Sequence, residues 1–317
     1  MIESRPRVLI LFLTYGDAYK GSLERFIAEY CTPLSCQKRL IIIENADENL
    51  PTRNIGDWIY EMGGDNSVFE FSGWQKAIDS ETASSFNADL YIFANSSLYT
   101  QRFYGLPIIN DEIVDIMSKY KFFSGKVRKR SFELTYEGLD LSLMVPTRFF
   151  AMHREVLEDL GCIISEYESE KFVKPTYSSD IFTDNNLWKG LLKKTTMADL
   201  TRKYHKNGIM ISPEHHRFFT RKILTITNEI LLSGRIKKLG YKIIDSTPFP
   251  KFSNSYYTIF TENTTIRPFQ FIRATILMSI YYLFRNSLAD KIGLGNWFRN
   301  RCASNVKRHL LRENQEI

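Results

Sequence analysis

The segment VLILFL, residues 8–13, is an uninterrupted apolar run that ends in the polar turn TYGD, residues 14–17. Such a run is typical of a strand buried on both faces of a parallel sheet. Apolar residues recur at helical spacing over 22–31, with Ser22 as the expected N-cap. The runs LIII, 40–43, and DLYIFA, 89–94, are further buried strands. The alternation predicts an α/β fold with right-handed crossovers.

The rest of the chain continues the pattern, with no internal repeat. We expect helices over 112–120 and 221–240, a strand and turn at 121–127, a strand leading into a helix over 142–161, and a short strand at 241–245. Residues 52–64 are expected to form a loop or short helix, and the polar residues 165–185 a loop. Gly161 is expected to end its helix as a C-cap.

Composition excludes several classes of protein. An apolar content of 44% and 23 Phe argue for a packed core rather than disorder. The four Cys form no CxxC pair, so no zinc site is expected. No window is long enough for a transmembrane helix, and no signal-peptide pattern is present, so we expect a cytoplasmic protein. Neither a dinucleotide-binding fingerprint nor a P-loop motif occurs.

The segment DNSVFEFSGWQKAI, residues 65–78, carries a glycine near the start of a predicted helix. Ligands of open parallel sheets bind at the carboxyl ends of the strands, and a helix N-terminus attracts anions. Gly73 would let a phosphate or sugar approach the backbone, in which case Gly73→Val abolishes ligand binding and leaves the fold intact. The alternative, which spacing alone favours, is that Gly73 lets the helix pack closely on a strand.

These segments, together with PTRFFAMHREVLEDLG at 146–161, resemble bacterial polysaccharide glycosyltransferases of the GT-A fold, in the rhamnosyltransferase-like group of O-antigen and capsule enzymes. The resemblance covers about residues 7–160 and is carried chiefly by EFSGW, 70–74. It implies a mostly parallel sheet flanked by helices and a nucleotide-sugar donor. The donor-binding residues that it implies are Thr14, Tyr15, Gly16, Glu44, Asn45, Asn66, Glu70, Ser72, Gly73, Trp74, Asn95 and Ser96.

One position departs from the family pattern. GT-A enzymes usually carry an Asp-x-Asp motif that binds Mg²⁺ or Mn²⁺, whereas here the third strand ends in ANSS, residues 94–97. No metal ligand is therefore assigned, although another acid could supply one. Without metal, cationic side chains must stabilise the departing diphosphate. The candidates are Arg102, Lys126, Arg128, Arg130, His215, His216 and Arg217; the alternative for KVRKR, 126–130, is a solvated basic loop.

An inverting transferase also needs a general base for the acceptor hydroxyl. Asp180 and Asp184 lie in the polar segment SSDIFTDNN, and Glu214 is a third candidate. Taken alone, each of the three fits a helix cap or a solvated acid better than a catalytic base. Glu229 lies within an amphipathic helical pattern and is expected to be structural.

Residues 260–317 carry nine Lys/Arg against four acids, which is +5 of the net charge of +6. The segment combines apolar, aromatic-rich stretches with regularly spaced Arg and Lys, as in helices that lie on anionic membrane surfaces. Packing of this tail on the rest of the chain is the alternative, and nucleic-acid binding ranks last because no motif supports it. We therefore expect a catalytic domain at 1–259 and a membrane-associating tail at 260–317.

Together, these features predict a glycosyltransferase that uses a UDP- or dTDP-sugar. Its acceptor would be a lipid-linked O-antigen or capsule precursor of lipopolysaccharide biosynthesis, at the cytoplasmic face of the inner membrane. The alternative is a non-catalytic scaffold subunit of a polysaccharide-assembly complex, which the missing acidic motif keeps open.

Overall fold

A computed structural model describes residues 5–17, 19–99, 109–129, 133–172 and 213–247, with the backbone alone for 213–219. Its centre is a mixed sheet of eight strands, ordered β12-β6-β11-β5-β1-β2-β4-β3. The strands span Arg7–Thr14 (β1), Gln37–Glu44 (β2), Arg53–Gly56 (β3), Ile59–Gly63 (β4), Leu90–Asn95 (β5), Phe123–Gly125 (β6), Phe149–His153 (β11) and Ile243–Asp245 (β12).

The sheet is mostly parallel, as the sequence predicts, with antiparallel exceptions. Parallel neighbours are β1 with β2 and with β5, β2 with β4, and β6 with β12. In contrast, β11 runs antiparallel to both β5 and β6, and β3 runs antiparallel to β4. Because β11 is reversed, the residues just before it lie at the carboxyl end of β5.

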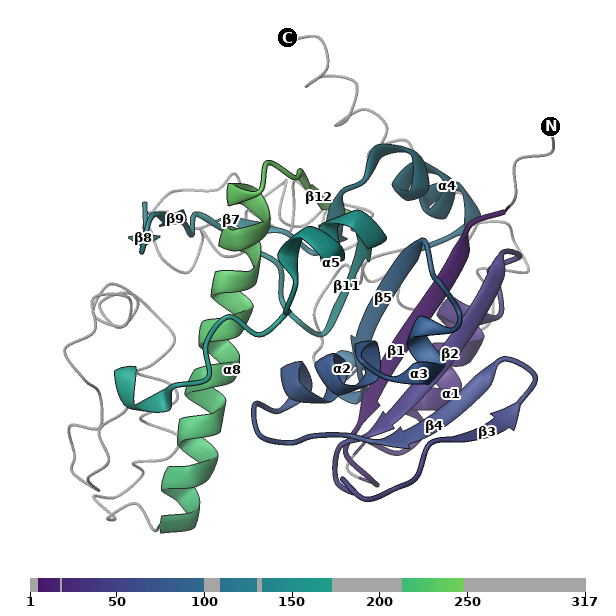
Figure 1. Ribbon diagram of the computed structural model, residues 1–317, viewed down its shortest axis with the longest axis horizontal. Helices are drawn as coiled ribbons and strands as arrows, with labels where there is room; N and C mark the ends of the chain where they lie inside the picture. The colour runs from purple at the N-terminus through teal and green to yellow at the C-terminus, as the bar shows by residue number, and fades with distance from the viewer. Residues whose placement is uncertain (1–4, 18, 100–108, 130–132, 173–212, 248–317) are drawn as a thin grey trace, which may run out of the picture.

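Helices cover both faces of the sheet (Figure 1). One face packs against α2 (Glu70–Ile78), α5 (Arg154–Leu160) and α8 (Pro213–Lys238), and α3 (Glu81–Ser84) adds Ala83 to the same core. The other face packs against α1 (Ser22–Phe26), the turn that follows it, Ile27–Cys31, and α4 (Asp111–Tyr120). β1 contributes Leu9, Leu11 and Leu13 to the first core and Val8, Ile10 and Phe12 to the second. The continuous apolar run is thus explained by burial on two sides.

Small two-stranded ribbons lie beside the sheet. β7 (Arg128–Lys129) pairs with β10 (Leu143–Met144), and β8 (Thr135–Tyr136) pairs with β9 (Leu139–Asp140). α8 packs against β9 and β10, and Gly234 gives the close approach: a Cβ there would lie 2.6 Å from Leu141 Cδ2.

Two local predictions were wrong. Residues 53–63 form the hairpin β3–β4 rather than a loop or helix, because β4 finds a parallel partner in β2 that periodicity cannot reveal. The N-cap of α1 is Gly21 in a left-handed conformation, and Ser22 is its first helical residue. The C-cap at Gly161 is confirmed, with φ 72°.

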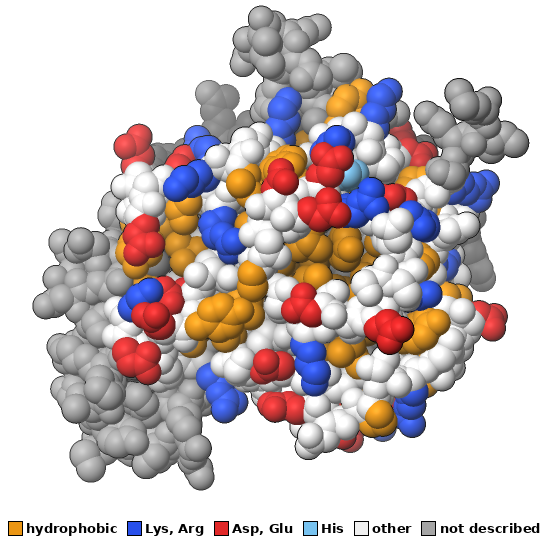
Figure 2. Space-filling view, viewed as in Figure 1, with side chains coloured by type: hydrophobic (Ala, Val, Ile, Leu, Met, Phe, Trp, Pro, Cys, Tyr) orange, Lys and Arg blue, Asp and Glu red, His pale blue; other side chains and the backbone are white. Residues whose placement is uncertain are grey.

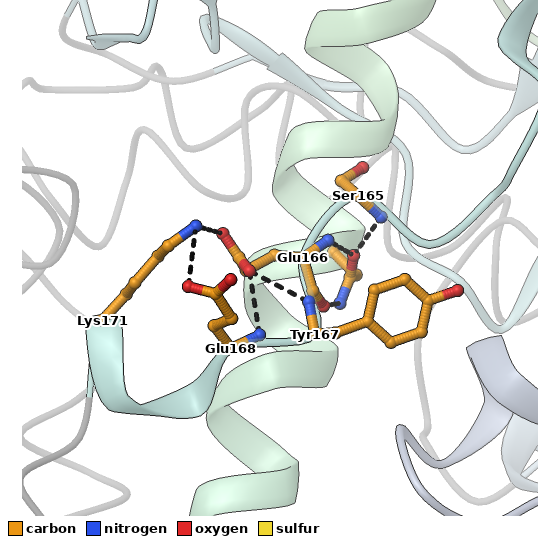
Figure 3. Close-up of polar contacts among 6 residues, drawn as sticks. Ser165, Glu166, Tyr167, Glu168 and Lys171 are labelled. Carbon is orange, nitrogen blue, oxygen red and sulfur yellow. Dashed lines mark hydrogen bonds and ion pairs between the residues drawn. The ribbon is translucent and has the colours of Figure 1, made fainter.

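The segment that follows Gly161 is fastened to α8 (Figure 3). Asn228, fully buried on α8, accepts hydrogen bonds from the backbone N–H groups of Ser165 and Glu166 and donates one to the Glu166 carbonyl. The Glu166 carboxylate in turn accepts from the Glu168 N–H and from Lys171 Nζ, each at 2.8 Å. Residues 165–172 are therefore an ordered strap on α8; the remainder of the predicted 165–185 loop lies outside the described residues.

Within the described residues, no helix is both long and apolar enough to cross a membrane. The predicted division at 259–260 and the basic tail fall outside them. Acidic and basic side chains are interspersed over the face shown in Figure 2.

Candidate functional site

Several strand ends meet at one edge of the sheet, which is the candidate site. Thr14 at the end of β1 is paired with Glu44 at the end of β2, and Leu13 is paired with Asn95 at the end of β5. The Asn95 N–H donates to the Arg148 carbonyl, so the residues that precede β11 close this edge. β6 and β12 end at the same edge, since Gly125 is paired both with Phe150 of β11 and with Asp245.

The groups that lie closest to the missing side chain of Gly73 are side chains of the protein itself. A Cβ at this position would lie 2.6 Å from Leu13 Cδ1 and 2.7 Å from Asn45 Oδ1. Gly64 makes room for the same Asn45 amide from the other side. The structure therefore favours the packing explanation of Gly73, and we expect Gly73→Val to disturb the fold, because its side chain would overlap those of Leu13 and Asn45.

Asn45 links the end of β2 to the start of α2. Its amide is 1% exposed and donates to Asn66 Oδ1 at 3.0 Å and to the Phe69 carbonyl at 3.1 Å. Phe69 is the N-cap of α2 and has a φ of 49°, a backbone conformation that residues other than glycine rarely adopt. Asn45 and Asn66 are thus brought together as predicted, but their observed role is to hold this turn.

Two members of the predicted donor set are part of the core. Trp74 has no exposed surface and lies edge-on to Phe71, Phe93 and Phe150 at 5.4–6.0 Å between ring centroids. Ser72 is 3% exposed; its Oγ accepts from the Val68 N–H and donates to the Asp65 carbonyl, which holds the loop before α2. Both side chains are therefore buried in the described structure.

The loops after β1 and β2 are joined by one carboxylate. Glu44 Oε1 accepts from the Gly16 N–H at 2.8 Å and from the Ala46 N–H at 2.9 Å. Gly16 has a φ of 53°, a conformation that favours glycine. Gly16 is exposed and Thr14 is partly exposed, so the first loop remains accessible.

The end of β5 does not suit a divalent cation. Asn95 Oδ1 already accepts from the N–H and the hydroxyl of Ser97, and Ser96 is fully buried. Across the described ranges, no group of three or more His, Cys, Asp or Glu could hold a metal ion. Since hard cations need several oxygen ligands, the residues present at this strand end do not fit Mg²⁺ or Mn²⁺.

Two carboxylates meet around a threonine at this edge. Thr147 Oγ1, 2% exposed, lies 3.1 Å from Glu70 Oε1 and 3.5 Å from Glu229 Oε2. The Tyr15 hydroxyl lies 3.4 Å from the other oxygen of Glu70, and burial together with the Glu70 charge raises the pKa of Tyr15. Glu70 is 8% exposed, whereas Glu229 is partly exposed.

Two cations act on these carboxylates, Arg128 and Arg148, and Lys126 lies beside both cations. Lys126 follows β6, Arg128 lies on β7 and Arg148 precedes β11. Burial lowers the pKa of Arg148, and the negative charges of Glu229 and Glu70 oppose that shift. Burial and the neighbouring charge of Arg128 lower the pKa of Lys126 to about 8. These partly buried cations from different elements form what we call the cation cluster, Lys126, Arg128 and Arg148.

Burial raises the pKa of Glu229, opposed by the charge of Arg128 and reinforced by that of Glu70. A carboxyl whose pKa is raised while cations surround it is a common feature of functional sites. The sequence assigns Glu229 a structural role, and the fold also places it within the candidate site, beside Thr147 and near Arg128 and Arg148. Its place near Glu70 could not have been found from sequence, since the two residues are 159 positions apart along the chain.

The predicted cations and acids divide into described and undescribed residues. Lys126 and Arg128 lie in the cation cluster. Sequence reasoning missed Arg148; its position directly before the apolar segment 149–152 is a weak signal. Glu214, His215, His216 and Arg217 lie on α8 where only the backbone is described. Asp180, Asp184, Arg102 and Arg130 lie outside the described residues.

Comparison with known proteins does not show a family for this chain. No protein-family description and no curated protein matches the sequence. Among solved structures, the chain is similar to a mannosyltransferase, PcManGT from Pyrobaculum calidifontis, determined with GDP-mannose and Mn²⁺. The identity is 10%, and the match covers 95% of this chain and 87% of the other. The TM-score of 0.31 is too low to show a shared fold.

Proposed function

We propose that the chain is a glycosyltransferase that takes its sugar from a nucleotide-diphosphate donor. The observation that carries the proposal is the cation cluster at the carboxyl edge of a mostly parallel sheet, where such folds bind ligands. Two arginines suit a diphosphate because each guanidinium presents paired donors to phosphate oxygens.

The cluster would take the part that a divalent metal plays elsewhere. As the sugar leaves the donor, negative charge develops on the diphosphate, and fixed cations stabilise that charge. Lys126, Arg128 and Arg148 are held by separate elements and are partly buried, so their fields are less screened than those of surface charges. Thr14, Tyr15 and Gly16 remain proposed nucleotide contacts on the accessible first loop.

We propose the acceptor and the location from the composition of residues 260–317 alone: a lipid-linked surface polysaccharide precursor, approached by a basic tail on the cytoplasmic face of the inner membrane. This part of the proposal is independent of the donor site, so it can be refuted while the donor-site proposal stands.

The test is thermal unfolding of the whole protein with UDP, dTDP, GDP or CMP, each with Mg²⁺ and with EDTA. A nucleotide at about 100 times its dissociation constant stabilises the folded state by roughly 2.7 kcal/mol. We expect one nucleoside diphosphate to raise the melting temperature in EDTA, and Arg128→Gln and Arg148→Gln to abolish the shift. Lys129→Gln, an exposed neighbour on β7, is the matched control.

Three outcomes are informative. A shift that disappears in EDTA would show that a metal bound elsewhere carries the diphosphate. A shift retained by both arginine variants would remove the cation cluster from the proposal. Binding without any release of nucleotide from a sugar donor would favour the scaffold function over the enzyme.

A further inference from the structure

Glu70 and Glu229 differ in what holds them. Both oxygens of Glu70 have a partner: Oε1 lies by the Thr147 hydroxyl and Oε2 by the Tyr15 hydroxyl. Among the described residues, Glu229 has one hydrogen-bond partner, Thr147, which lies by Oε2, and no hydrogen bond reaches its Oε1. Glu229 is also the more exposed of the two. One carboxylate is thus locked in the structure, and the other presents an oxygen at the edge of the site.

The threonine between them can carry only one proton. If the Thr147 hydroxyl donates to Glu70 at 3.1 Å, its oxygen is left to accept from Glu229. This arrangement suits a Glu229 that alternates between the carboxylate and the carboxylic acid. The ionised form faces the charges of Arg128 and Arg148, and the protonated form can donate to Thr147.

From this geometry we infer that Glu229 is the general base that deprotonates the acceptor hydroxyl, an inference that rests on the proposed transferase function. The acceptor oxygen attacks the anomeric carbon of the donor sugar, and its proton passes to Glu229 Oε1. The bond between the anomeric carbon and the diphosphate oxygen breaks, and the nucleoside diphosphate leaves with the electron pair beside Arg128 and Arg148. Glu70 and Thr147 position Glu229.

The same environment gives a pH signature. The charged groups that act on Glu229 come from α2, β7, the turn before β11 and its own helix: Glu70, Arg128, Arg148 and Lys222. Because burial raises the pKa of Glu229 above the ordinary value of 4.5, the base becomes protonated at a higher pH than an ordinary glutamate does. Turnover should therefore fall as the pH is lowered, through an acid limb that belongs to this one carboxyl.

The experiment measures release of nucleoside diphosphate from UDP-glucose, UDP-N-acetylglucosamine, dTDP-rhamnose and GDP-mannose, with water or a bacterial membrane extract as the acceptor. The full-length protein, Glu229→Gln, Glu229→Asp and the surface control Glu158→Gln are compared. We expect Glu229→Gln to lower kcat at least about 100-fold, as for the loss of a general base, with the nucleotide dissociation constant changed less than threefold. The variant should also lose the acid limb of the pH profile.

A readout without turnover accompanies it. Since the folded pKa of Glu229 is raised, the wild-type carboxyl stabilises the fold below its unfolded pKa and loses that contribution as pH rises through the folded pKa. Glu229→Gln mimics the protonated form, so its melting temperature relative to wild type should rise between pH 5 and pH 8. A similar difference at both pH values would contradict the raised pKa.

Failure of the inference and failure of the function are distinct. If wild type releases nucleotide and Glu229→Gln keeps its rate within threefold, Glu229 is not the base and the transferase stands. If Glu229→Gln weakens nucleotide binding as much as turnover, Glu229 only positions the arginines. If wild type releases no nucleotide from any donor, both proposals are overturned.

Discussion

Gly73→Ala is the sharpest test of how the segment 65–78 works. The substitution adds one methyl group that would meet Leu13 Cδ1 at 2.6 Å and Asn45 Oδ1 at 2.7 Å. Such separations are well inside van der Waals contact, so at least one of the two neighbours must move. Leu13 lies in the fully buried core, and the Asn45 amide is held between Gly64 and Gly73.

The expected cost follows from three contributions. Overpacking of a buried site costs roughly 1–3 kcal/mol. Displacing Asn45 weakens its hydrogen bonds to Asn66 and Phe69, at about 0.5–1.5 kcal/mol each. Alanine returns about 1 kcal/mol through its better helix propensity. The net prediction is a loss of about 3 kcal/mol in the free energy of unfolding.

Urea denaturation of Gly73→Ala against wild type measures this loss directly. Gly56→Ala is the matched control, because its Cβ would lie at an ordinary 3.7 Å from Ile59 and the change should be near neutral. A double-mutant cycle with Asn45→Ala should show that the Gly73 substitution costs less once the amide is gone. Wild-type stability in Gly73→Ala, with nucleotide binding lost, would refute the packing argument and return Gly73 to the ligand.

Two further predictions concern α8 and the cation cluster. Asn228→Ala leaves the N–H groups of Ser165 and Glu166 without their buried acceptor and should cost roughly 2–4 kcal/mol, with faster proteolysis of the 165–172 strap. Lys171→Ala breaks an exposed ion pair that solvent screens, so its effect on stability should be much smaller. An equal loss in both variants would contradict the role of Asn228 in holding the strap. Because the pKa of Lys126 is about 8, its charge is lost as pH rises through that value, so nucleoside diphosphate binding should weaken between pH 7 and pH 9. Lys126→Met should bind the nucleoside diphosphate more weakly than wild type at pH 7, and its affinity should not fall further by pH 9. Calorimetry at the two pH values measures both affinities.

The residues of the candidate site separate into scaffold and surface. Asn45, Ser72, Gly73 and Trp74 build the junction between β2 and α2 and are buried. Packing therefore accounts for the spacing of Ser72, Gly73 and Trp74 within EFSGW, whereas Glu70 of the same segment reaches Thr147 in the candidate site. The groups available for chemistry come instead from the ends of β6, β7 and β11 and from α8.

The sequence by itself determined the strands of the parallel core. An apolar run such as residues 8–13 has to be buried on both sides, and its polar end has to face a loop, whatever the rest of the chain does. The same local logic located α2, α4, α5 and α8, because helical periodicity and caps are contained within a few neighbouring residues.

Only the tertiary structure decided the rest. The hairpin at 53–63 exists because β2 offers its edge to β4, and β11 is antiparallel because of how the chain returns to β5; neither partner is visible in a local pattern. The meeting of Glu70, Thr147 and Glu229 depends on segments far apart in sequence. Electrostatic coupling depends on distance in space and on burial, so the character of this site could be found only once the chain was folded.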